Sequence, residues 1–242
     1  MHRRRHYIYP DLDTLAAAFV CDLNRFLKET RAEDRTVHIA LSGGSTPLAI
    51  YHQLASATWP EEWKHVHLYW GDERCVPASS TESNYGNARK FFLDPMGISE
   101  KRIHPIRGEA DPQLEAERYS QLLRDQLPEE NGLPVFDWIW LGLGEDGHTA
   151  SIFPDQIELW KSDQLCVVAR HPVTGQKRVT LTGTVINAAR RVAFLVAGKS
   201  KSHIVNEIVM KEGDYLKYPA FYVAPDSDNL EWYLDMDATS WM

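Results

Sequence analysis

The sequence has few cysteines. Only Cys21, Cys75 and Cys166 occur in 242 residues, and they stand far apart, without CxxC pairs or histidines at zinc-finger spacing. This pattern excludes a disulfide framework and a structural zinc site. The two histidines of the stretch HVH, His65 and His67, are interpreted as structural. We therefore expect no metal site and a reducing, cytoplasmic compartment.

Positive charge is also scarce. Lysine and arginine number 26 against 34 aspartates and glutamates, which gives a formal net charge of -8 and an isoelectric point near 5.7. Extended binding to nucleic acid or to an anionic membrane requires a basic surface, so both kinds of partner are excluded. An anionic ligand of this protein must be small and held by a local cluster of cations.

Long apolar runs are missing as well. No segment approaches the ~20 apolar residues that a membrane-spanning helix requires. The chain begins MHRRRHYIYPDLD, and no apolar run of the length found in a secretory signal follows the basic residues. The arginines at positions 3–5 are expected to form a solvated tail.

Apolar residues alternate between helical and strand spacing along the chain. Three-and-four spacing predicts helices over residues 12–27, 47–57, 84–93, about 116–127 and about 204–209. Near-continuous apolar runs predict strands over 36–42, 65–70, 136–143, 165–170, 178–182 and 191–198. We therefore expect an α/β fold in one domain, residues 1–242: an open, mostly parallel, doubly wound sheet with helices on both faces. Residues 71–83, 108–112 and 128–134 are expected to be loops.

Residues at the ends of these strands are the first candidates for function, because ligands of open α/β sheets bind beyond the carboxyl ends of the strands. The strand at 36–42 runs into Gly43, Gly44, Ser45 and Thr46. Thr46 is expected to cap a helix, with the following proline as its first residue. Free amides, flexible glycines and two hydroxyls suit a phosphate group. A plain strand-to-helix turn is the alternative, and the absence of GK[ST] excludes a Walker loop.

Charged side chains follow two other strands. Asp72 and Arg74 come directly after the strand at 65–70, and an arginine there can bind a phosphate with two hydrogen bonds. A solvated charged loop is the alternative. The stretch AGKSK, 197–201, again places a glycine and a helix start after a strand. The candidates for anion binding are therefore Arg74, Arg178, Lys199 and Lys201.

The segment GLGEDGH, 142–148, has the GxGxxG spacing of dinucleotide-binding loops. Such a loop needs a long helix after its last glycine and an acidic residue at the end of the next strand. Here Pro154 follows soon, and the next strand ends near Arg170, so only an arginine of the NADP type keeps that interpretation open. We favour a sharp turn that brings Asp146 and His148 to the cleft, where a histidine is suited to take a proton from water.

These blocks, in this order, resemble the 6-phosphogluconolactonase family: LSGGSTP, WGDERCVP with SNYGNAR behind it, GLGEDGHTASIFP, RVTLT and AGKSK. The resemblance covers roughly residues 38–201. It implies hydrolysis of 6-phospho-D-glucono-1,5-lactone to 6-phosphogluconate in the oxidative pentose phosphate pathway, without a metal or cofactor.

The resemblance also implies roles for the candidate residues. His148, oriented by Asp146, would act as the base that activates water. Asp72 would orient Arg74 or contact a sugar hydroxyl, and these alternatives stay open. The phosphate would be held by Gly43, Gly44, Ser45, Thr46, Arg74, Arg178 and Lys201.

The related glucosamine-6-phosphate isomerases (deaminases) provide the main alternative. Their loop reads like DGHIAFNEP, with a carboxylate before the proline where this chain has Phe153, so the ring-opening machinery is incomplete here. A non-catalytic sugar-phosphate sensor would need no DGH loop, and an NADP-dependent reductase would bind the dinucleotide. No GxSxG motif occurs, so a covalent acyl-enzyme is not expected.

Overall fold

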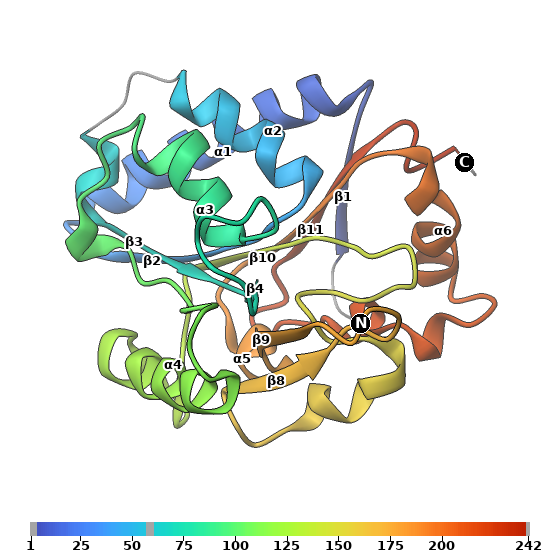
Figure 1. The fold of residues 1–242 in the computed structure, drawn as a ribbon. Helices are drawn as coiled ribbons and strands as arrows, with labels where there is room; N and C mark the ends of the chain where they lie inside the picture. Colours follow the sequence, from blue (N-terminus) through green and yellow to red (C-terminus); the bar gives the residue numbers. More distant parts are fainter. Residues whose placement is uncertain (1–3, 57–60, 241–242) are drawn as a thin grey trace.

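A six-stranded parallel sheet forms the centre of the molecule (Figure 1). The computed structural model describes residues 4–56 and 61–240. The strands lie in the order β1-β11-β10-β7-β2-β3, and each neighbouring pair runs parallel. Their bounds are β1 (Arg4–Tyr9), β2 (Val37–Leu41), β3 (Val66–Trp70), β7 (Trp138–Leu141), β10 (Val192–Val196) and β11 (Leu230–Asp235).

Helices cover both faces of this sheet, which confirms the predicted α/β fold with a doubly wound, mostly parallel sheet (Figure 1). In α1, the apolar stripe that includes Leu15, Phe19 and Leu23 is fully buried, as its spacing predicts. The predicted end of the second helix at residue 57 lies outside the described residues. The helices are α1 (Leu12–Ala32), α2 (Ser45–Ala55) and α3 (Asn84–Ala88) on one face, α4 (Pro112–Gln126) and α5 (Gly183–Ala188) on the other, and α6 (Ser202–Met210) beside the edge of the sheet.

Two predicted strands do not belong to the central sheet. β8 (Cys166–Arg170) and β9 (Lys177–Leu181) form an antiparallel hairpin, and β4 (Asp72–Arg74) pairs antiparallel with β9. Both segments are strands, as predicted, and they pair antiparallel because the connection at 171–176 is too short for the crossover that parallel neighbours need. Leu181 N donates to Gly71 O at 2.8 Å, so this small sheet is attached at the end of β3.

The N-terminal segment is a strand rather than a solvated tail. β1 pairs with β11 from Arg4 against Leu230 to Tyr9 against Asp235, and neither strand was predicted. Arg5 forms an ion pair with Glu231 at 3.3 Å, so the expectation of a tail is wrong for positions 4 and 5. Residue 3 lies outside the described part of the chain.

Two of the predicted loops contain short strands. The segment 71–83 includes β4, which gives the small sheet its third strand. The segment 128–134 folds as a hairpin of β5 (Glu129–Glu130) and β6 (Leu133–Pro134). Strands of two or three residues are too short to show a period in the sequence, so the loop expectation is corrected at both places.

The direction in which the chain adds strands to the sheet reverses between β2 and β7. From β2 the chain moves outwards to β3, and from β7 it moves the other way through β10 and β11. The loops that follow β2 and β7 therefore leave the sheet on either side of a crevice, which is where doubly wound folds bind their ligands. These loops carry GGST and GEDGH, so the topology brings the two motifs to one place.

Candidate active site

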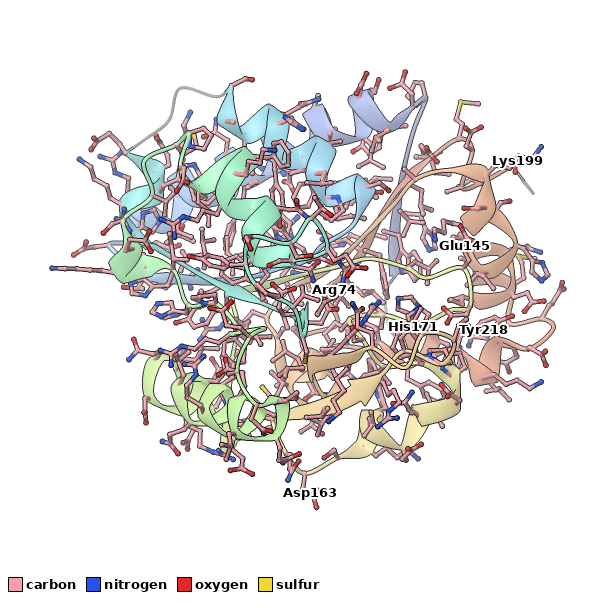
Figure 2. The ribbon with its side chains drawn as sticks, viewed as in Figure 1. Arg74, Glu145, Asp163, His171, Lys199 and Tyr218 are labelled. Carbon is pink, nitrogen blue, oxygen red and sulfur yellow. The ribbon has the colours of Figure 1, made fainter. Side chains whose placement is uncertain are left out.

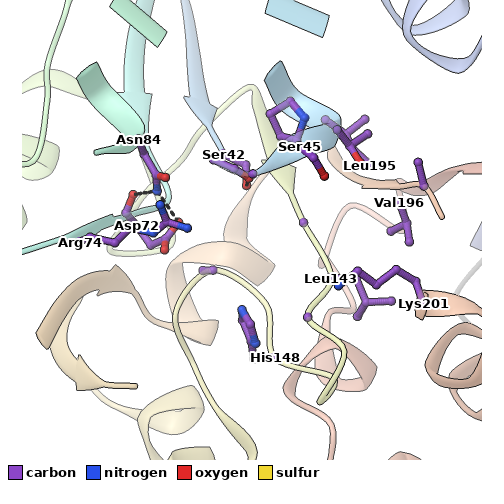
Figure 3. Close-up of a pocket in the computed structure, with 18 of the residues that line it drawn as sticks. Ser42, Ser45, Asp72, Arg74, Asn84, Leu143, His148, Leu195, Val196 and Lys201 are labelled. Carbon is purple, nitrogen blue, oxygen red and sulfur yellow. Dashed lines mark hydrogen bonds between the residues drawn. The ribbon is translucent and has the colours of Figure 1, made fainter. Parts of the chain in front are cut away.

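A cavity of about 190 Å³ lies in this crevice (Figure 3). The segments that follow β2, β7 and β10 form its wall together with the short strand β4 and a side chain from β9. Asp146 is hydrogen-bonded to His148, and Lys199 is exposed at the surface in Figure 2. The predicted residues that line the cavity are Gly43, Gly44, Ser45, Thr46, Asp72, Arg74, His148, Arg178 and Lys201.

The N-terminus of α2 opens onto the cavity. Gly44 is the N-cap residue with φ of +105°, the helix begins at Ser45, and no side chain within the described residues caps it. The prediction of Thr46 as the N-cap is wrong: glycine adopts this backbone conformation at little cost, so the helix starts earlier. The first backbone amides and the positive end of the helix dipole are therefore available to an anion.

Asp146 and His148 form a hydrogen-bonded pair in the loop after β7. His148 Nδ1 lies 2.6 Å from Asp146 Oδ1, and the His148 amide donates to the same oxygen at 3.1 Å. Because an ionised carboxylate only accepts, we assign the proton to Nδ1, which leaves a lone pair on Nε2. Burial by itself raises the pKa of Asp146, but the hydrogen bonds and proximity of His148 outweigh it and lower the pKa to about 2. The pair thus presents an oriented imidazole able to accept a proton.

The backbone of this loop leaves room for the pair. A Cβ atom at Gly144 would overlap the ring of His148 and the carboxylate of Asp146. Gly147 and Ala150 have positive φ values of 82° and 48°, and this conformation costs energy for alanine. The pair therefore depends on a glycine at position 144.

The same loop lacks the helix that a dinucleotide fingerprint requires. After Gly147 the chain passes through turns to a 3-10 helix at Pro154–Lys161, with a kink inside it. A dinucleotide loop leads directly into a long helix whose N-terminus holds the pyrophosphate. The glycine spacing is thus explained by the sharp turn.

Two residues that the sequence analysis did not single out hold Asp72 in the cavity wall. Ser151 Oγ donates to Asp72 Oδ2 at 2.5 Å, and Asn84 Nδ2 donates to Asp72 Oδ1 at 3.3 Å. Arg178 Nη1 donates to Ser151 Oγ at 3.4 Å. Within the described residues Asp72 has no hydrogen bond or ion pair with Arg74. The blocks SNYGNAR and DGHTASIFP contained these two residues, but neither directly follows a strand.

Glu73, the neighbour of Asp72, faces the protein interior and holds the turn that carries Asn84. Its carboxylate accepts from the amides of Asn84 and Tyr85, each at 2.8 Å, and from Ser83 Oγ at 3.0 Å. Burial raises the pKa of Glu73, and the backbone hydrogen bonds oppose this effect. Successive residues of a strand face opposite sides, so Asp72 reaches the cavity while Glu73 organises the wall behind it.

Cationic side chains stand on opposite sides of the cavity. In Figure 3, Arg74 lies on one side, Lys201 on the other, and His148 between them. Lys201 is 22% exposed, and its Nζ is 3.6 Å from Glu145 Oε1. The guanidinium of Arg74 donates to the backbone carbonyl of Glu82. Cationic side chains therefore stand at both ends of the cavity, although the whole chain is acidic.

Arg178 connects the base to the Asp72 side of the cavity. Its guanidinium carbon lies 5.4 Å from the centre of the Phe153 ring, and that ring lies 4.6 Å from the ring of His148. Burial lowers the pKa of Arg178, while the charge of Asp72 raises it. Phe153 is fully buried, so it supports both side chains.

Among residues 4–56 and 61–240, no group of three or more His, Cys, Asp and Glu side chains is placed to hold a metal ion. His65 Nε2 pairs instead with Thr30 Oγ1 at 3.1 Å, and His67 Nδ1 with His104 Nε2 at 2.9 Å. In the same part of the chain, no helix combines the length and apolar character needed to cross a membrane.

Comparison with known proteins places the chain among enzymes of sugar phosphates. The family model described as glucosamine-6-phosphate isomerases/6-phosphogluconolactonase matches residues 10–232. The 6-phosphogluconolactonase of Haemophilus influenzae is 45% identical over 204 residues, which cover 84% of this chain and 86% of the relative. That of Synechocystis sp. is 44% identical over 223 residues, which cover 91% and 90%. The solved 6-phosphogluconolactonase from Trypanosoma brucei superposes with a TM-score of 0.89, at 30% identity and 100% coverage of both chains.

Proposed function

This chain belongs to the family of glucosamine-6-phosphate isomerases and 6-phosphogluconolactonases, and from that premise we propose that it is a 6-phosphogluconolactonase. It would hydrolyse 6-phospho-D-glucono-1,5-lactone to 6-phosphogluconate in the oxidative pentose phosphate pathway. One observation carries the proposal: His148, whose Nε2 has no hydrogen-bond partner in the described part of the chain, lies in the same small cavity as several cations and a helix N-terminus that no described side chain caps. Such a site can bind a phosphate and activate water beside it.

His148 is the proposed base. Nε2 takes a proton from water as the water oxygen attacks the lactone carbonyl carbon. The tetrahedral intermediate then collapses, the bond to the ring oxygen breaks, and Nε2 returns the proton to that oxygen. Asp146 accepts the hydrogen bond from Nδ1–H throughout and stabilises the charged imidazole. A positioned base of this kind accelerates a reaction by about 10²- to 10⁴-fold.

The phosphate binds at the N-terminus of α2. The backbone of Gly43 and Gly44 and the first turn at Ser45 and Thr46 provide amides and hydroxyls, and Lys201 lines the same cavity. Arg74 and Arg178, which were also expected to hold the phosphate, are paired across β4 and β9, and Arg74 lies on the side of the cavity away from Lys201 (Figure 3). The substrate is thus recognised through its anionic group.

Phe153 supports hydrolysis over the isomerase alternative. The ring-opening reaction of the related isomerases employs a carboxylate at the position before the proline, where this chain has Phe153. Its buried ring lies against His148 and neither donates nor accepts a proton. The loop therefore offers Asp146 as its carboxylate partner for His148.

The proposed hydrolysis consumes only water. Activity is expected to survive EDTA, and titration with NADPH should leave the fluorescence of the eight tryptophans unchanged apart from absorptive losses. We further propose a cytoplasmic location, where the free thiols of Cys21, Cys75 and Cys166 stay reduced.

Acid release tests the function directly. The phosphorylated lactone is generated in situ, and the rate of proton release with enzyme is compared with the spontaneous rate. Unphosphorylated gluconolactone, expected to be a very poor substrate, serves as the control for phosphate recognition. A rate equal to the spontaneous one would refute the proposal, and formation of fructose 6-phosphate from glucosamine 6-phosphate would favour the isomerase.

A further inference from the structure

Asp72 presents a carboxylate to the cavity that the proposed mechanism does not use. The residue is 5% exposed and lines the cavity wall. Ser151 donates to one of its oxygens and Asn84 to the other. An ionised carboxylate has about four acceptor sites, so two of them remain for a ligand. A sugar hydroxyl, which carries one O–H donor, can fill such a site.

The carboxylate is held in place before a ligand arrives. Asn84 Nδ2 also donates to the Asp72 carbonyl oxygen at 3.0 Å, and because both partners only accept, the orientation of the Asn84 amide is settled. Ser151 is fully buried. Its Oγ accepts a hydrogen bond from Arg178, so the hydroxyl proton of Ser151 is directed to Asp72. These hydrogen bonds hold the Asp72 carboxylate in one orientation and so fix the direction of its remaining acceptor sites.

The position of Asp72 indicates which part of the substrate it meets. In Figure 3, Asp72 and Asn84 lie on the side of the cavity away from Ser45 and Lys201, with His148 between. With the phosphate at Lys201 and the carbonyl beside His148, the edge of the ring opposite the phosphate arm faces Asp72. That edge carries the hydroxyls on C2 and C3.

We propose that Asp72 accepts a hydrogen bond from the C2 or C3 hydroxyl of the lactone, with Asn84 and Ser151 as its positioning residues. This inference rests on the proposed lactonase function. It makes Asp72 a specificity-determining residue and leaves the activation of water to His148. Sugar lactones that lack the recognised hydroxyl leave a buried carboxylate without its partner and are rejected.

The experiment combines Asp72→Asn with the lactone and its 2-deoxy and 3-deoxy analogues. Asp72→Asn should lower kcat/KM for the full substrate by about 10- to 150-fold, the effect of losing one charge-assisted hydrogen bond. In the wild type, kcat/KM for one of the two analogues should be lower than for the full substrate by a similar factor. With that same analogue, Asp72→Asn should lower kcat/KM by no more than about threefold. Asp163→Asn changes an exposed carboxylate that does not line the cavity and lies far from Arg74 in Figure 2; it is the matched control and should change nothing.

Ser151→Ala provides a second variant that keeps the charge of Asp72. Ser151→Ala should lower kcat/KM for the full substrate by a smaller factor than Asp72→Asn and should hardly change kcat/KM for the analogue that lacks the recognised hydroxyl. The rise of kcat with pH should persist in both variants. An equal loss for the full substrate and both analogues, or no loss at all, would overturn the inference while the wild type still hydrolyses the lactone. A wild type without activity would overturn the proposed function and this inference together.

Discussion

Replacing His148 by asparagine removes the proposed base and keeps most of its surroundings. Asparagine can keep a polar contact with Asp146, which lies 2.6 Å from Nδ1, but it cannot accept a proton near pH 7. Because the base acts mainly in the transition state, kcat should fall by at least ~10²-fold while KM changes little. A loss of 10²- to 10⁴-fold corresponds to about 3 to 5 kcal/mol of activation free energy. Proton release is the assay, and His52→Asn, an exposed histidine of α2, is the control.

The pH dependence of kcat separates a base from a structural histidine. A histidine base must be unprotonated to act, so kcat should rise with pH in the neutral range and then level off. Asp146, with a pKa of about 2, stays ionised over this range and cannot produce that rise. Spontaneous hydrolysis also quickens with pH and is subtracted at every point. His148 is not the base if His148→Asn retains more than about a third of the parent kcat or keeps the same rise.

Three further changes test the site and the core. Lys201→Met should lower kcat/KM for the phosphorylated lactone by about 10- to 150-fold and leave slow turnover of gluconolactone unaltered; equal turnover of the phosphorylated substrate would contradict the phosphate site. Gly144→Ala places a Cβ against the ring of His148, so kcat should drop by at least about tenfold while calorimetry still detects binding of 6-phosphogluconate; full activity would mean that the pair tolerates displacement. Burial lowers the pKa of His38 and of His104 to about 4. Because the unfolded value is near 6.5, their contribution to stability is complete above pH 6.5 and is lost as the pH falls towards 4. The free energy of unfolding measured with urea should therefore be lower at pH 4.5 than at pH 7, by up to about 5 kcal/mol if both histidines contribute fully, and His104→Gln should reduce the difference.

Local patterns in the sequence predicted the main elements of the fold. The spacing of Leu15, Phe19 and Leu23 predicts α1 because one face of a helix must be buried, whatever lies against it. Continuous apolar runs identify β2, β3, β7 and β10 because strands of a covered parallel sheet are buried on both faces. The rule that ligands meet the carboxyl ends of such strands then places GGST and His148 in one crevice.

The sequence by itself thus determined the order of the main helices and of β2, β3, β7 and β10, and it identified the motifs that follow β2 and β7. Only the tertiary structure decided what depends on contacts between distant segments. The pairing of β1 with β11 and the separation of β8 and β9 from the central sheet depend on backbone hydrogen bonds that no local period encodes. The same holds for Asp72, whose donors Asn84 and Ser151 lie 12 and 79 positions away. Periodicity reports which face of an element is buried, whereas the direction of a hydrogen bond depends on the partner that folding brings within about 3 Å.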